Sequence, residues 1–388
     1  MNFRTFAARL SIVAMALAVA SCSQSGSSVE TSPRIQIEIP RLSPISSGDS
    51  ADSGVESLAA LNLDGKVDAL LKKEPDTKPK MLVMLADIKK SSRNHAEAAV
   101  YYLAAIRRDP KLMIARYQFA CNLALWGHRR LALETIRKAV DDGFWGYEMM
   151  RTDDDFASIQ DSPEFKTLLT KVKDRYPAEA AKRAGKPHLR VPEGKSPVKG
   201  WPIIVFLHGY GDRGESYIPH AEYAAVNGFA GIAISGPVVQ WEDQFAWPSD
   251  RFETTHGFLQ QNMEQFRDRK DLDRKRVFLV GFSQGAVHAA GLLASHPEAY
   301  AGGIALSPGG DPGVPKAVKT GERACPLCVI HGKRELLGNI LEANSCATAW
   351  KRANWPVLEE THPDRHQFPE DWDERFPRLL KWLMKNGK

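Results

Sequence analysis

The chain has 388 residues, of which 43% are hydrophobic and 26% are charged, an ordinary composition for globular domains. This length is sufficient for two domains that each bury a core. The net charge is only +5, and the lysines and arginines are scattered along the chain, so a nucleic-acid-binding surface is not indicated. Five cysteines are too few for a disulfide scaffold.

The first residues have the pattern of an export signal. Arg4 and Arg9 precede an apolar core of about a dozen residues, which is too short to span a bilayer as a helix. The stretch ends in the letters VASC at Cys22, which resembles the lipobox of bacterial lipoproteins. We therefore predict a lipoprotein signal peptide over residues 1–22, lipidation of Cys22, and an exported protein anchored to a membrane of the bacterial cell envelope. A plain secretory peptide with an incidental cysteine is the alternative.

Residues 23–55 are rich in serine, glycine and proline. This composition is typical of a flexible segment. We predict that it is a tether between the signal peptide and the folded part of the chain.

From residue 56 to residue 180, apolar residues recur at helical spacing and glycine and proline are few. Two windows match at an offset of 34 residues, and Pro110 lies where the first unit ends. The matching pairs are Ala86 with Ala120, Ala98 with Ala132, Tyr102 with Ile136, and Ala105 with Ala139. The pattern resembles a pair of tetratricopeptide repeats, with an earlier and weaker unit around residues 56–80. This resemblance implies a surface for a protein partner, and a generic helical bundle is the alternative.

A lysine-, glycine- and proline-rich segment follows, and the pattern changes after Trp201. Short apolar runs then alternate with helical stretches. The runs are PIIVFLHG, AGIAISGP, RVFLVGFS, YAGGIALSP, CPLCVIHG and PVLEETH. Such alternation predicts a mostly parallel sheet with helices on both faces. We assign this α/β domain to residues 187–388 and expect it to be separable from the helical region, because the segment between them suggests few crossing contacts.

Ser283 lies in the sequence GFSQG, where a predicted strand turns directly into a predicted helix. A nucleophilic serine at such a turn needs glycines two positions to each side, because larger side chains would collide with the adjacent strand and helix. The start of the helix offers unpaired N–H groups to an oxyanion. The pattern therefore favours a nucleophile elbow over an ordinary glycine-rich turn.

A serine nucleophile needs a base, which in turn is oriented by a carboxylate. In this kind of fold the chain order is serine, acid, histidine. Glu335 follows a predicted strand and is our choice for the acid, with Asp311 as the rival. His366 is our choice for the base, because His362 lies only one residue beyond the last predicted strand whereas His366 lies on a longer loop.

A second oxyanion donor is expected after the first strand, in the sequence HGYGD. The backbone N–H of Tyr210 suits this role, beside the backbone N–H of Gln284 after the nucleophile. These two residues form the predicted oxyanion hole.

Three motifs together are specific: HGYGD at residues 208–212, GFSQG at 281–285 and HGKRE at 331–335. They are similar to motifs of the carboxylesterase and acyl-protein thioesterase branch of the α/β-hydrolases, and the resemblance runs from about Pro187 to Lys388. It implies the α/β-hydrolase fold, a serine–acid–histidine triad and two backbone oxyanion donors. The related enzymes usually have aspartate where this chain has Glu335, whose extra methylene moves the carboxylate by about a bond length.

Trp241, Phe245 and Trp247 fall in a predicted loop before a long helix over residues 252–268. Aromatic side chains in such a loop line a substrate pocket or pack against the fold. The sequence leaves both interpretations open.

Cys325 and Cys328 are separated by two residues. In an extended strand their Cα atoms would lie about 10 Å apart, which is too far for a disulfide. No second cysteine pair exists to complete a zinc site, so we predict a structural role. No metal or cofactor is expected.

Together these features predict a serine hydrolase that cleaves a small carboxylic ester or thioester through an acyl-enzyme on Ser283. Two alternatives stay open. One is a scaffold lipoprotein whose hydrolase domain no longer turns over, and the other is a serine peptidase of the same fold.

Overall fold

The structure is a computed structural model that describes residues 57–183, 185–248, 252–309 and 324–387. The predicted signal peptide, the tether, Cys22 and Asp311 lie outside the described residues. Within the described residues, no helix combines the length and the apolar character needed to cross a membrane.

The described chain falls into two compact units. We call them the helical unit, which ends at Val172, and the α/β unit, which runs from Lys173 onward. The two units are not contiguous in sequence. Trp145–Thr152 belongs to the α/β unit, whereas the following residues Asp153–Val172 belong to the helical unit. The α/β unit therefore includes residues that precede the domain boundary suggested by the sequence.

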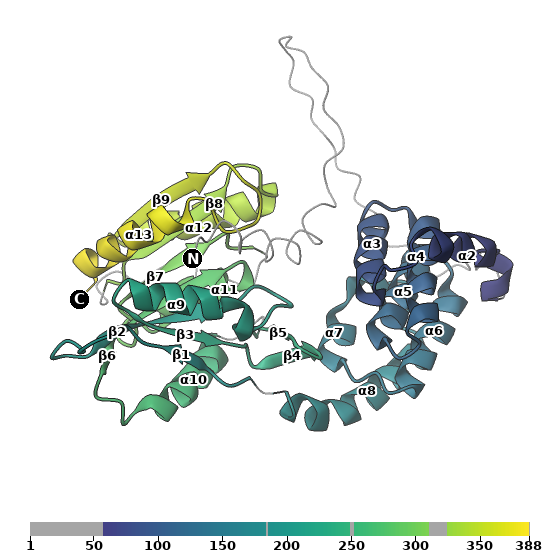
Figure 1. The fold of residues 1–388 in the computed structure, drawn as a ribbon, viewed down its shortest axis with the longest axis horizontal. Helices are drawn as coiled ribbons and strands as arrows, with labels where there is room; N and C mark the ends of the chain where they lie inside the picture. The colour runs from purple at the N-terminus through teal and green to yellow at the C-terminus, as the bar shows by residue number, and fades with distance from the viewer. Residues whose placement is uncertain (1–56, 184, 249–251, 310–323, 388) are drawn as a thin grey trace, which may run out of the picture. The chain divides into compact units, whose positions relative to one another are not determined.

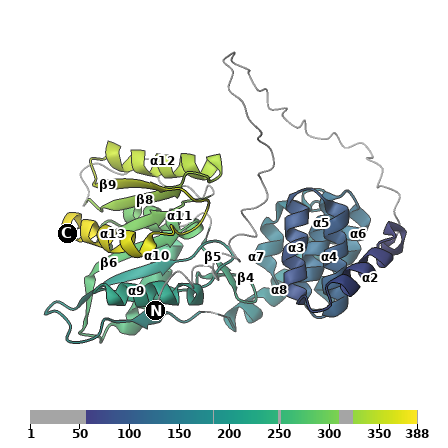
Figure 2. The same ribbon diagram turned by 45° about the horizontal axis from the view of Figure 1, so that its top comes forward.

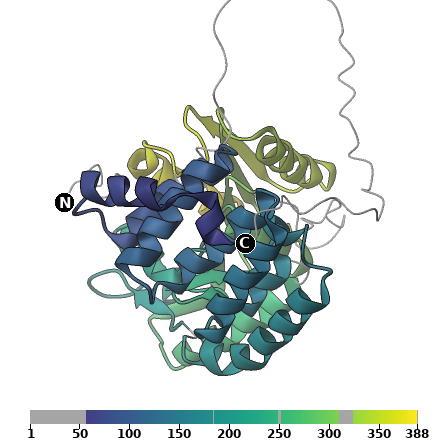
Figure 3. The same ribbon diagram turned by 90° about the vertical axis from the view of Figure 1, so that its right-hand side faces the viewer.

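The helical unit is built from paired antiparallel helices, which Figure 2 and Figure 3 show stacked side by side. Its elements are η2 (Leu58–Leu61), α2 (Asp64–Lys73), α3 (Pro79–Ser91), α4 (His95–Arg108), α5 (Met113–Leu125), α6 (Arg129–Asp141), η3 (Asp154–Phe156) and the first part of α8 (Pro163–Ala181). Helices α5 and α6 begin 34 residues after α3 and α4, so the structure repeats at the period found in the sequence. All eight residues of the matching pairs are fully buried.

The α/β unit has a seven-stranded sheet with the order β1-β3-β2-β6-β7-β8-β9, drawn in teal to yellow in Figure 1. The strands are β1 (His188–Arg190), β2 (Trp201–Leu207), β3 (Ala230–Ile234), β6 (Leu272–Phe282), β7 (Gly302–Leu306), β8 (Leu327–Gly332) and β9 (Val357–His362). Only β1 is antiparallel to its neighbour, and the remaining strands are parallel. The predicted mostly parallel sheet is confirmed, and all six predicted strands are present.

Helices cover both faces of the sheet, as predicted. Residues of α10 (Phe252–Met263), α11 (Gln284–Ser295) and α12 (Leu337–Arg352) pack on one face, together with Ile203 and Val205 of β2. Residues of α9 (Ile218–Val226) and α13 (Trp372–Asn386) pack on the other face, with Ile204 and Phe206. Because successive side chains of a strand point to opposite faces, the unbroken apolar run of β2 supplies both cores.

The segment predicted as a loop before α10 is instead a β-hairpin. Strands β4 (Val238–Trp241) and β5 (Gln244–Ala246) pair antiparallel and form a separate small sheet. Helix α10 also ends earlier than the sequence suggested, at Met263 rather than residue 268. Helix α7 (Tyr147–Thr152) packs against β4 (Figure 1).

Candidate active site

Ser283 occupies the turn between the end of β6 and the start of α11. Its backbone has φ 54° and ψ −120°, a conformation that L-residues rarely adopt. The two flanking glycines are required by close backbone contacts. A Cβ atom at Gly281 would overlap the backbone of Gly285, and one at Gly285 would overlap the carbonyl oxygen of Leu207. This sharp strand-to-helix turn is the geometry expected of a nucleophile elbow.

The structure brings Ser283, His366 and Glu335 into one hydrogen-bonded row. The Nε2 atom of His366 lies 2.9 Å from the Ser283 Oγ atom, and its Nδ1 atom lies 2.9 Å from an oxygen of Glu335. A neutral imidazole that donates its Nδ1 proton to Glu335 leaves Nε2 free to accept the serine proton. This is the arrangement of a base between its nucleophile and its orienting acid.

His362, the other candidate base, is directed elsewhere. It is the last residue of β9, its ring is buried, and its Nδ1 atom lies 3.4 Å from Asp364. Burial lowers the pKa of this imidazole, which keeps it neutral. His366 is four residues further along the chain, in the loop that leads to α13, and there it reaches Ser283.

Glu335 is fixed by several donors in addition to His366. One carboxylate oxygen accepts hydrogen bonds from the Ser307 hydroxyl at 2.5 Å and the Gly332 N–H at 2.8 Å. The other accepts from the Asn339 amide at 3.2 Å. Burial alone would raise the pKa of the Glu335 carboxyl, but the hydrogen bonds from His366, Ser307 and Gly332 outweigh it and lower the pKa to about 2. The acid is therefore charged at neutral pH.

Ser307 and Asn339 are parts of this site that the sequence analysis missed. Ser307 directly follows β7 in a left-handed conformation with φ 50°, and its side chain is buried. Asn339 lies in the first turn of α12, and its amide nitrogen is also 3.1 Å from the His366 Nδ1 atom. The two residues hold the acid from opposite ends of the carboxylate.

The loop after β2 lies directly beside Ser283. A Cβ atom at Gly209 would be 3.4 Å from the Ser283 Cβ atom. The loop begins at buried His208, whose Nε2 atom accepts a hydrogen bond from the Gly236 N–H at 2.8 Å and whose Nδ1 atom is 2.7 Å from the Gly209 carbonyl. Burial lowers the pKa of His208, and the neutral ring can make both hydrogen bonds. The loop carrying Tyr210 is thus held in a fixed position next to the serine.

Gln284 is the first residue of α11, so its N–H has no acceptor within the helix. Its side chain makes a double hydrogen bond with the backbone of Trp247, at 3.0 Å to the N–H and 2.9 Å to the carbonyl. The Trp247 indole N–H in turn donates to the His208 carbonyl at 2.9 Å. The two predicted oxyanion residues, Tyr210 and Gln284, therefore belong to one connected set of loops around Ser283.

The three aromatic residues assigned to a substrate pocket or to packing are all buried. Trp241, Phe245 and Trp247 are 5%, 4% and 1% exposed. The Trp247 side chain is part of the core beneath α10 and α11. This burial favours packing, and a direct contact with substrate stays a prediction.

The two cysteines noted in the sequence are not part of the Ser283–His366–Glu335 row. Cys325 and Cys328 are buried, and the Cys325 thiol donates to the carbonyls of Pro297 and Tyr300 at 3.3 Å. Among the described residues, a group with metal-ligating geometry comprises Cys121, Asp153 and Asp155 of the helical unit. The Lys90 ammonium already provides a positive charge beside this group, because it lies 2.6 Å from an oxygen of Asp155.

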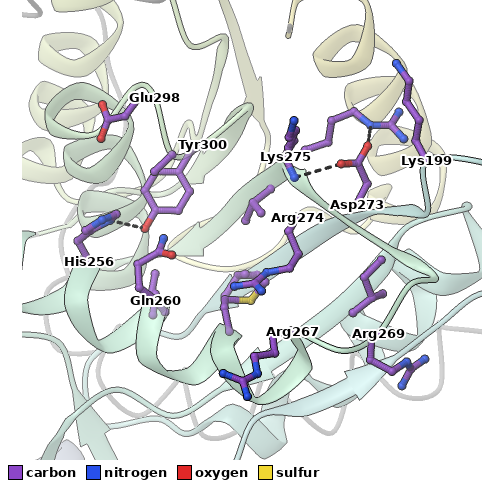
Figure 4. A pocket seen from close by; sticks show the side chains of 17 residues that line it. Lys199, His256, Gln260, Arg267, Arg269, Asp273, Arg274, Lys275, Glu298 and Tyr300 are labelled. Atoms are coloured by element: carbon purple, nitrogen blue, oxygen red, sulfur yellow. Dashed lines mark hydrogen bonds and ion pairs between the residues drawn. The ribbon is translucent and has the colours of Figure 1, made fainter.

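A pocket of about 1250 Å³ lies at the other end of β6, around the residues shown in Figure 4. Its lining includes several lysines and arginines, but three of them are paired with acids. Arg276 pairs with Asp273, Arg269 with Asp271, and Arg274 with Glu264. The pocket is at the start of the strand whose end carries Ser283, so we assign it no part in the chemistry.

The fold, the elbow and the hydrogen-bonded row define an α/β-hydrolase of the esterase type. Residues 187–383, slightly more than half of the chain, match the family model described as phospholipase/carboxylesterase. The chain belongs to this family.

Several solved structures are similar to the chain. An uncharacterized protein from Bacillus cereus is 18% identical, with a TM-score of 0.43, and the match covers 80% of this chain and 99% of that one. A Bacillus cereus carboxylesterase is 16% identical, with a TM-score of 0.43 and coverage of 53% and 98%. A fluorophosphonate-binding serine hydrolase of Staphylococcus aureus is 18% identical, with a TM-score of 0.40 and coverage of 51% and 91%. The comparison with curated proteins found no match.

Proposed function

We propose that the α/β unit hydrolyses carboxylic esters or thioesters through an acyl-enzyme on Ser283. The observation that carries this proposal is the continuous row from the Ser283 Oγ atom through His366 to Glu335, with 2.9 Å at each step. The charged state of Glu335 supports it further, because a charged acid stabilises the imidazolium that forms during attack.

In the proposed reaction, the Ser283 oxygen forms a bond to the carbonyl carbon while its proton passes to His366 Nε2. The carbonyl oxygen becomes negative and is stabilised by the backbone N–H groups of Tyr210 and Gln284. The bond to the alcohol or thiol then breaks, and His366 returns the proton to the leaving group. Water repeats the sequence on the acyl-enzyme and releases the acid.

The decisive experiment uses the full chain with a fluorophosphonate probe and a short p-nitrophenyl ester. We expect wild type to be labelled and to hydrolyse the ester, and Ser283→Ala to do neither, with kcat lower by several powers of ten. Ser295→Ala is the matched control, because Ser295 ends α11 and its hydroxyl donates a hydrogen bond to the Gly291 carbonyl of its own helix. Hydrolysis by Ser283→Ala within tenfold of wild type would exclude the mechanism. Failure of wild type to label would instead favour the inactive scaffold.

We also propose that Cys22 carries a lipid anchor and that the helical unit is a tetratricopeptide-type module that binds a protein partner. The VASC sequence supports the first, and the 34-residue repeat of helix pairs supports the second. Incorporation of labelled palmitate by the full chain tests the anchor, since an unmodified Cys22 would remain unlabelled. Cross-linking from surface positions of the helical unit, carried out in the cell envelope, tests whether this unit binds a protein partner.

A further inference from the structure

Trp145 lies outside the residues that match the family, yet it belongs to the α/β unit and is buried there. Its side chain is 5% exposed and stacks on Trp241, with ring centroids 4.8 Å apart and an angle of 27° between the planes. The guanidinium of Arg183 lies over the same ring, 4.4 Å from its centroid. Such stacked and cation–π contacts fix the relative orientation of the groups as well as burying them.

The strand that carries Trp241 has a second contact to this segment. The backbone of Val239 in β4 hydrogen-bonds the Tyr176 hydroxyl, and the Tyr176 ring lies 6.4 Å from Trp145. Helix α7 packs on β4, as Figure 1 shows. Residues 145–152 and 173–183 therefore form one aromatic support for the β4–β5 hairpin, and all of them belong to the α/β unit.

The hairpin in turn holds the loop beside Ser283. The carbonyl of Phe245 in β5 accepts from the Gly211 N–H at 2.8 Å, and the Phe245 N–H donates to the Asp212 carbonyl at 2.9 Å. The Tyr210 hydroxyl donates to Gln240 of β4 at 3.2 Å. The loop over residues 209–212 is thus paired with the hairpin almost as if it were a third strand.

We infer that Trp145 is a positioning residue of the active site, which acts through Trp241 and the hairpin to fix the loop that carries the Tyr210 N–H. Its effect on catalysis rests on the function proposed above. An oxyanion donor is effective only when it is already aimed at the position where charge develops, so a shift of about 1 Å in this loop lowers the rate without removing any group that reacts.

The test compares Trp145→Ala with Trp126→Ala in the full chain. Trp126 is a partly buried tryptophan of the helical unit that contacts His128 edge-on, at 4.7 Å between centroids. Titration with the fluorophosphonate counts the folded sites, and ester hydrolysis then gives kcat for each titrated site. We expect about tenfold to a hundredfold lower kcat for Trp145→Ala, KM within about twofold, and wild-type values for Trp126→Ala. Trp145→Phe, which keeps an aromatic ring, is expected to restore most of the rate.

A merely structural role gives a different result, namely fewer titrated sites but wild-type kcat for each of them, and this result would overturn the inference. If Trp145→Ala does not fold, Trp145→Leu keeps an apolar side chain without a stacking ring, and the same loss of kcat is expected.

Hydrogen exchange separates this inference from the proposed function. In Trp145→Ala or Trp145→Leu, the amides of residues 209–212 and 244–247 should exchange faster than in wild type, and Trp126→Ala should leave them unchanged. If wild type neither labels nor hydrolyses the ester, the proposed function fails while exchange still decides the role of Trp145. Unchanged exchange in both Trp145 variants contradicts it.

Discussion

The carboxylate of Glu335 receives hydrogen bonds from groups at or after the ends of three different strands and from one helix. Ser307 follows β7, Gly332 ends β8, His366 follows β9, and Asn339 is in α12. A glutamate has one more rotatable bond than the aspartate usual in related enzymes. These donors remove that freedom, because both of its oxygens are occupied.

Replacing the acid by its amide isolates the role of its charge. We expect Glu335→Gln to lower kcat about a thousandfold or more, because an amide cannot stabilise the imidazolium or favour the productive tautomer. Steady-state kinetics on the p-nitrophenyl ester measures the loss, with Glu342→Gln in α12 as the matched control. The prediction is wrong if Asp311→Asn proves far more harmful than Glu335→Gln.

The same substitution makes a stability prediction. The pKa of Glu335 is about 2 in the folded chain, whereas a glutamate in the unfolded chain has its ordinary pKa of 4.5. The charged carboxylate therefore stabilises the fold above pH 4.5, and this contribution is lost as the pH falls toward 2. The side chain is fully buried, and the shift corresponds to about 3 kcal/mol. In urea unfolding, the stability advantage of wild type over Glu335→Gln should shrink by this amount between pH 5 and pH 2. A constant difference across that range would contradict the shifted pKa.

At this scale, chain order and strand ends narrowed the candidates to Ser283, to Glu335 or Asp311, and to His362 or His366, and loop length then favoured His366. The structure places Ser283, Glu335 and His366 next to one another. Each of these three residues can be found from its local sequence. The serine lies at a strand-to-helix turn, and the acid and the histidine each follow a later strand. Ser307 and Asn339 have no such pattern. Their importance depends on β7 and β8 being adjacent and on the first turn of α12 facing the acid, which only the fold reveals.

At the scale of the elements, the turn from β6 into α11 is tightly packed against its neighbours. The backbone of Gly285 lies against the carbonyls of Leu207 and His208, so β2, the following loop and α11 meet there without a side chain between them. This contact sets how closely the nucleophile approaches the oxyanion loop.

We therefore expect Gly285→Ala to lower the free energy of unfolding by about 1 to 3 kcal/mol or more, because its new methyl group overlaps backbone that cannot move independently. Gly257→Ala in α10 is the matched control, since among the described residues no atom beyond its chain neighbours and its own helix backbone lies within 4 Å of the added Cβ. That change should be neutral or stabilise the protein by up to about 1 kcal/mol, because alanine favours helix. Denaturant unfolding of both variants measures the difference, and equal stability would argue against a tight elbow.

The long buried strands and the 34-residue helix repeat could be predicted from the sequence because each has a strong period. The β4–β5 hairpin could not, because its strands have only four and three residues and its alternating pattern is short. Strand β1, with three partly buried residues, was missed for the same reason. The shortest elements are stabilised by their neighbours rather than by their own pattern.

At the scale of the whole molecule, the sequence suggested a separable hydrolase domain after the lysine- and glycine-rich segment. The structure gives a reason to expect otherwise, since Trp145–Thr152 and residues from Lys173 onward belong to one compact unit. A chain beginning at Ala184 would expose Trp241 and remove the contacts of Trp145 and Tyr176 with β4.

We expect this shortened chain to lose activity or solubility relative to the full chain. The full chain, which keeps both the support and the complete helical unit, serves as the comparison. Size-exclusion chromatography and kcat for each titrated site measure the two effects. Full activity of the chain from Ala184 would mean that the support is dispensable.

The interleaving of the two units also affects how the protein is made. Trp145 leaves the ribosome roughly 100 residues before Trp241, which is on the order of 5 to 20 s at ordinary rates of synthesis. The helical unit is complete only once Val172 has been made, and from then until β4 follows, the aromatic side chains of residues 145–152 and 173–183 have no hairpin to cover them. The nascent chain therefore leaves these aromatic side chains uncovered until β4 has been made, and a chaperone that binds apolar surface could cover them during this interval.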